Sequence, residues 1–109
     1  MLDLAGKEIF IVCSDPGAAQ AVLTLYKDFE SCKIKVTVIA RKAARFFAIN
    51  QKIPIYIGKE AYGNIPSIKY FVSLKNPIAV ITGTSLVDNL ERNYIKSCRE
   101  LDKIGRAHV

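Results

Sequence analysis

The chain has 109 residues, of which 50% are hydrophobic, and a formal net charge of +6. This length and composition fit one globular domain with a real core, and they exclude an intrinsically disordered chain. No apolar run approaches the roughly 20 residues that cross a bilayer, and the amino terminus is a poor signal peptide. We therefore expect a cytoplasmic protein without an integral membrane segment.

Strands and helices are predicted to alternate along the chain. A nearly continuous apolar run over Glu8–Cys13 predicts a central parallel strand that is buried on both faces. The following helix is predicted with Asp15 as its cap and Pro16 in its first turn. Its apolar face has helical spacing and contains Ala18, Val22, Leu25, Tyr26 and Phe29. A second strand is predicted over residues 33–40, and a short helix follows around Ala43, Phe46, Phe47 and Ile49.

The second half continues the alternation. Residues 53–58 predict a short strand at an edge or in an irregular position, because Pro54 cannot donate a ladder hydrogen bond. Pro66 opens a helix whose predicted buried side contains Ile68, Phe71, Val72 and Leu74. A buried strand at residues 78–81 precedes a long helix over residues 85–102, with an apolar stripe of Leu86, Leu90, Tyr94, Cys98 and Leu101. Together these elements predict an α/β, Rossmann-like, doubly wound sandwich with a mainly parallel sheet of about four strands.

The last six residues, 104–109, read Ile-Gly-Arg-Ala-His-Val. This string is the translation of the sequencing adapter AGATCGGAAGAGCACACGTC from its third base, and the leftover AG would complete the codon of Lys103. We therefore expect residues 1–103 to form the domain, the tail to be non-native, and the natural protein to continue into a further strand; a genuine hydrophilic tail is the alternative. His108 is given no role, and without the tail's one arginine the net charge falls from +6 to +5.

Small and polar residues end two of the predicted strands. They are Ser14, Asp15, Gly17 and Ala18 after the first strand, and Gly83, Thr84 and Ser85 after the strand at residues 78–81. Such turns meet at the carboxyl edge of a parallel sheet, where ligands bind, and the helix N–H groups there can hold an anion or a sugar hydroxyl. Purely structural roles stay open, since Gly17 and Ala18 allow close packing and Ser85 can cap its helix.

Several familiar sites are excluded. The chain has no phosphate loop and only one glycine in its first turn, and Ala40-Arg41-Lys42 stands where an acid would hold the ribose of NAD. A phosphate contact through Arg41 stays open. The cysteines are odd in number and widely spaced, so we expect reduced thiols, no metal site and no cofactor. The basic residues lack interleaved aromatic residues, so no nucleic-acid partner is expected.

Residues 8–20, with the core Ser14-Asp-Pro-Gly-Ala, resemble the amino-terminal Rossmann-like domain of GT-B-fold glycosyltransferases and the related UDP-N-acetylglucosamine 2-epimerases. The same holds for Val80-Ile-Thr-Gly-Thr-Ser85, Leu90-Glu91 and residues 97–101. The resemblance covers most of residues 8–102 and rests on short motifs. It implies the acceptor-side half of a two-domain enzyme, whose missing carboxyl-terminal domain supplies most contacts to a sugar or nucleotide-sugar ligand.

The resemblance also implies site residues. Asp15, Gly17, Gly83 and Thr84 would line the cleft, with Asp15 as the only carboxylate there suited to act as a base or to bind hydroxyl groups. No catalytic histidine and no nucleotide-binding motif can be carried over, so the fragment alone would be inactive.

Two other functions stay open. The first is a phosphocarrier that resembles the cellobiose-type IIB subunits of the sugar phosphotransferase system, with Cys13 as phospho-acceptor. Against it, Asp15 and Pro16 place a negative charge and a proline in the loop that must hold phosphate. The second is a non-catalytic binding domain of flavodoxin-like architecture.

Overall fold

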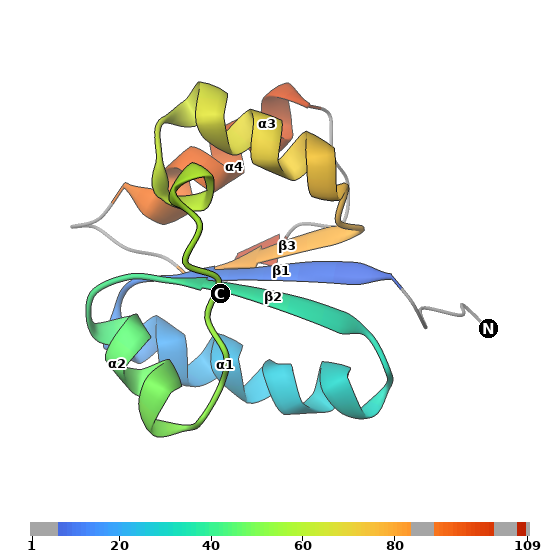
Figure 1. Ribbon diagram of the computed structural model, residues 1–109. Coiled ribbons are helices and arrows are strands. Elements are labelled where there is room, and N and C mark those ends of the chain that lie inside the picture. The colour runs from blue at the N-terminus through green and yellow to red at the C-terminus, as the bar shows by residue number, and fades with distance from the viewer. Residues whose placement is uncertain (1–6, 84–88, 102–106, 109) are drawn as a thin grey trace.

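The computed structural model describes residues 7–83, 89–101 and 107–108. Its parallel strands are β1 (Glu8–Cys13), β2 (Lys35–Ala40), β3 (Ala79–Thr82) and β4 (Ala107–His108), in the spatial order β2-β1-β3-β4. Helices α1 (Pro16–Ser31) and α2 (Ala43–Asn50) cover one face of the sheet, while α3 (Ile65–Lys75) and α4 (Leu90–Glu100) cover the other (Figure 1). The predicted α/β, Rossmann-like, doubly wound fold is confirmed. The three longer strands carry the sheet, since β4 has only two residues.

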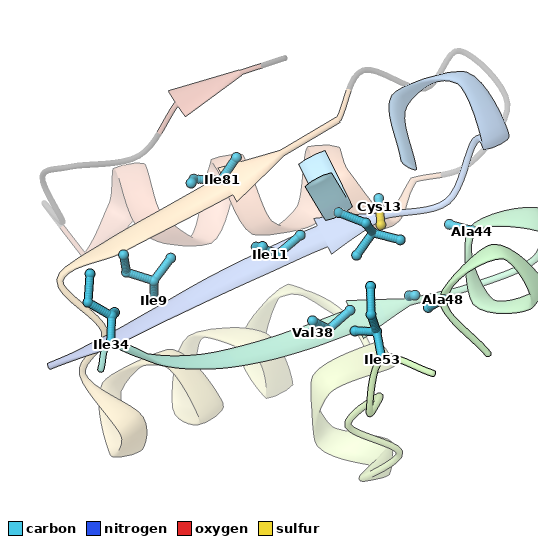
Figure 2. Close-up of a cluster of buried hydrophobic side chains, with 11 residues drawn as sticks. Ile9, Ile11, Cys13, Ile34, Val38, Ala44, Ala48, Ile53 and Ile81 are labelled. Atoms are coloured by element: carbon cyan, nitrogen blue, oxygen red, sulfur yellow. The ribbon is translucent and has the colours of Figure 1, made fainter. Parts of the chain in front are cut away.

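Strand β1 lies at the centre of the core. Because successive side chains of a strand point to opposite faces, Ile9, Ile11 and Cys13 join the cluster under α1 and α2, which Figure 2 shows, while Phe10 and Val12 join the cluster under α3 and α4. All five of these side chains are buried. The prediction of a strand buried on both faces is therefore correct.

The free edge of β2 is covered by an irregular segment. The Tyr56 N–H donates to the Val38 carbonyl over 2.8 Å, although no strand is formed around Pro54. The short helix η1 (Lys59–Tyr62) follows and leads the chain across to α3. The predicted edge position is correct, but the short strand predicted there is not formed, since Pro54 lacks the N–H that a ladder needs.

Some predicted boundaries and faces differ. Helix α4 begins at Leu90 with Asn89 as its N-cap, and not at residue 85 as predicted. Leu74 is 66% exposed rather than buried. Helix α2 packs on the sheet through Ala44 and Ala48, because small side chains let it lie close to the strands, and Phe46 is 71% exposed. The other helix residues predicted to be buried in α3 are buried.

Candidate functional site

Strands β1 and β3 end side by side at the carboxyl edge of the sheet. The two strands are hydrogen-bonded neighbours, and the Gly83 N–H donates to the Val12 carbonyl over 3.0 Å. The chain leaves β1 for α1 on one face and leaves β3 for α4 on the opposite face (Figure 1). This point is the topological switch point of the sheet, where open α/β folds have their ligand crevice.

Ser14 connects the end of β1 to α2 and α4 by hydrogen bonds, and it is only 2% exposed. Its N–H donates to Glu91 Oε2 over 3.1 Å, and its hydroxyl donates to Glu91 Oε1 over 2.7 Å. Its carbonyl accepts a hydrogen bond from the Ala44 N–H over 3.1 Å. The turn after β1 is therefore bonded both to α4 and to α2. The Ser14 hydroxyl already donates its proton to Glu91.

Glu91 is a second carboxylate at this edge, in addition to Asp15. It lies in the first turn of α4 and is 1% exposed. A buried carboxylate is costly unless it is hydrogen-bonded, and the two donors of Ser14 supply such bonds. Glu91 is among the residues that resemble GT-B-fold domains, but the resemblance assigned it no role. The sequence signal was present, because Glu91, Tyr94 and Cys98 have the i, i+3, i+7 spacing of one buried helix face.

The environment of Cys13 does not favour a phospho-acceptor. The side chain is fully buried, and burial, together with the nearby negative charge of Glu91, raises the pKa of Cys13 to about 12. The thiolate is the nucleophilic form of cysteine, and it is scarce at neutral pH with such a pKa. Cys98 is buried as well, Cys32 is exposed, and all three cysteines are free thiols.

The other predicted site residues are placed as follows. Asp15 is the N-cap residue of α1, as predicted, and is partly exposed, although its side chain makes no capping hydrogen bond. Gly17 and Ala18 lie in the first turn of α1. Thr84 and Ser85 lie outside the described residues. Asp15 is thus the partly exposed carboxylate of this edge, and Glu91 is the buried one.

Elsewhere in the described chain no other site stands out. Residues 7–83, 89–101 and 107–108 contain no cluster of three potential metal ligands, and no helix within them is long and apolar enough to cross a membrane. A hollow of about 450 Å³ lies along the outer side of α4, lined among these residues by Arg92, Ile95, Lys96, Arg99 and Glu100. Its described lining comes from one helix alone, so we place the candidate site at the switch point instead.

No protein-family model and no curated protein matches the chain. The chain is similar in fold to the crystal structure of a candidate UDP-N-acetylglucosamine 2-epimerase from Listeria monocytogenes, with a TM-score of 0.67 and 17% identity. The match covers 96% of this chain and 30% of that chain. The chain therefore spans less than a third of that protein and shares the fold of this part of it.

Proposed function

We propose that this chain is the amino-terminal, acceptor-side domain of a GT-B-like glycosyltransferase or sugar-nucleotide epimerase. The observation that carries the proposal is the Gly83–Val12 hydrogen bond, because it sets the end of β3 beside the end of β1 at the switch point. The fold similarity to a protein named as a candidate UDP-N-acetylglucosamine 2-epimerase supports the same class of ligand, a sugar or nucleotide sugar.

Each residue of the edge has a proposed part. Asp15, partly exposed at the start of α1, acts as a base or binds sugar hydroxyls, while Gly83 lets a ligand approach the backbone. Gly17, Ala18, Thr84 and Ser85 complete the ligand-contacting set, while Ser14, which was predicted with them, is 2% exposed and bonded to Glu91. Glu91 holds Ser14 in place and does not itself touch the ligand, because it is 1% exposed.

The proposal includes a division of labour. A carboxyl-terminal domain, absent from this chain, supplies most of the nucleotide contacts, and residues 104–109 are a non-native tail. The present chain is then inactive alone and works in the cytoplasm only as part of the longer protein. Reading the uninterrupted gene tests this directly: a second α/β domain after residue 103 supports the proposal, and a natural stop codon there contradicts it.

A binding experiment on the 109-residue chain tests the site. Titration with UDP-N-acetylglucosamine, followed by amide NMR, is expected to shift the signals of Asp15 and Gly83 with weak affinity in the millimolar range. Asp15→Asn should reduce these shifts, whereas Asp28→Asn, an exposed aspartate of the same helix, should not. Tight binding would contradict the division of labour, and shifts confined to other regions would contradict the site.

A further inference from the structure

Three basic side chains stand within five residues at the carboxyl end of β2: Arg41, Lys42 and Arg45. Strand β2 pairs with β1 so that Ala40 lies opposite Cys13, and both strands end at the same level. The Arg41 N–H donates to the Cys13 carbonyl over 3.1 Å, next to the bond from Ala44 to Ser14. The basic cluster is therefore fixed beside the turn that carries Asp15.

The guanidinium of Arg45 is held in one orientation. Its Nε–H donates to the Ala40 carbonyl over 3.0 Å, and its central carbon lies 5.2 Å from the ring centroid of Tyr62. Tyr62 is itself fixed, because its hydroxyl oxygen accepts from the Ala40 N–H over 3.2 Å and its hydroxyl donates to the Tyr56 carbonyl. Arg45 is only partly exposed, so this arrangement sets the direction of the remaining guanidinium N–H groups.

The bonding of Arg45 leaves donors for a ligand. Among residues 7–83 and 89–101, no carboxylate forms an ion pair with Arg45, and only its Nε–H donates to the protein. The terminal amino groups of a guanidinium match the spacing of phosphate oxygens and can donate to them in pairs.

Charge at this edge also favours an anion. The cluster brings three cations to this edge, which has two carboxylates nearby: Asp15 in the neighbouring turn and the buried Glu91 of α4, which accepts from Ser14. Backbone amides contribute little, because the Ala44 N–H donates to Ser14 and the Arg45 N–H to the Lys42 carbonyl. Side chains would therefore carry the binding.

We propose that Arg45, with Arg41 and Lys42, forms a subsite for a phosphate group at the carboxyl end of β2. The inference rests on the proposed function and deepens it, since it states that the ligand of this edge is phosphorylated. The phosphate can come from the diphosphate of a nucleotide sugar or from a phosphorylated acceptor, and Asp15 would then meet the sugar next to it.

The test is an NMR titration of the 109-residue chain that observes the Arg45 Nε–H and the amides of residues 41–45. The ligands are inorganic pyrophosphate, UDP, N-acetylglucosamine 1-phosphate and, as the neutral control, N-acetylglucosamine. We expect the three phosphate compounds to shift the Arg45 signal and the neutral sugar to leave it unchanged. Tighter binding of UDP than of the sugar phosphate would assign the subsite to the nucleotide, and the reverse order to the acceptor.

Variants separate the subsite from general attraction of anions to a basic protein. Arg45→Gln should weaken pyrophosphate binding about tenfold, and Arg45→Lys about fivefold, since lysine keeps the charge but loses the paired donors. Arg99→Gln and Arg99→Lys are the matched controls, because Arg99 is exposed at the far end of α4, and they should leave the affinity unchanged. Circular dichroism checks that each variant is folded.

An unshifted Arg45 signal in the wild-type chain would overturn the subsite, as would equal weakening by the variants of Arg45 and Arg99. The outcomes also distinguish it from the proposed function. If pyrophosphate shifts Arg45 while no sugar compound shifts Asp15 or Gly83, the subsite stands and the proposed function fails. If sugar compounds shift Asp15 and Gly83 equally in Arg45→Gln, the proposed function stands and the subsite fails.

Discussion

Replacing Glu91 with alanine tests whether one buried carboxylate holds the first turn against α4. The change removes the acceptor of the Ser14 N–H and of the Ser14 hydroxyl, which lie 3.1 and 2.7 Å from the carboxylate oxygens. Because Ser14 is only 2% exposed, water cannot readily replace that acceptor. Both donors are then left without a partner inside the protein.

The size of the effect follows from these two bonds. Hydrogen bonds to a charged group contribute about 1.5–3 kcal/mol each, so the loss of both costs about 3–6 kcal/mol. Removing the carboxylate also ends the cost of burying its charge, which offsets part of this loss. We expect the free energy of unfolding to fall by about 2–4 kcal/mol, which lowers the Tm of a domain of this size by about 10–25 °C.

Glu91→Gln separates the charge from the hydrogen bonds. The amide keeps the shape of the side chain and one acceptor oxygen, and the Ser14 hydroxyl can rotate to accept from its N–H group. The expected loss is therefore only about 1 kcal/mol.

Urea denaturation followed by circular dichroism measures the free energy of unfolding of each variant. Glu100→Ala is the control, because Glu100 lies on the same helix, is 40% exposed and pairs with Lys69 over 3.2 Å. Such a surface pair contributes about 0–1 kcal/mol, so this variant should be close to the wild-type stability. The reasoning about Ser14 is refuted if Glu91→Ala is as stable as the wild type or no less stable than Glu100→Ala.

Three further predictions concern the thiols and the core. A thiol reagent at neutral pH should modify the exposed Cys32 in the native protein and leave the buried Cys13 unmodified. Mass spectrometry of the peptides measures this, and modification of Cys13 before Cys32 would contradict the prediction. Since burial raises the pKa of Cys13 from 9.0 to about 12, only the unfolded chain loses this proton between those values, so stability should be full below pH 9 and fall as the pH rises toward 12. Cys13→Ala should flatten that slope in urea denaturation, and an unchanged slope would contradict the assignment. Tyr94→Phe removes the 2.7 Å hydrogen bond to the Ala61 carbonyl and should cost about 1–2 kcal/mol of unfolding free energy, whereas Tyr70→Phe at an exposed position should cost nothing measurable.

Local sequence pattern predicted part of the candidate site. The apolar run of β1 and the small residues after it indicated a buried strand that ends in a ligand-facing turn, and Gly83 was assigned to the same edge by the same reasoning. The partnership of Ser14 with Glu91 was not predicted, because the two residues are 77 positions apart and an acid in the first turn of a helix has an ordinary role as a partner of the helix dipole.

The basic cluster gives a second case. The sequence left open a phosphate contact through Arg41, but it gave no sign that Arg45 stacks on Tyr62, which reaches β2 from the short helix η1. In the same way, the pattern of α3 placed Leu74 with the buried residues, although its side chain is 66% exposed in the folded domain.

Local sequence patterns were enough to predict the order of strands and helices, the central place of β1 and the carboxyl edge as the ligand edge, since these depend on neighbours along the chain and on the missing N–H of proline. Which side chains meet at that edge depends on how the chain folds in three dimensions. The sheet order β2-β1-β3 brings α2, α4 and the first turn together around Ser14, and no local preference specifies contacts between such distant segments.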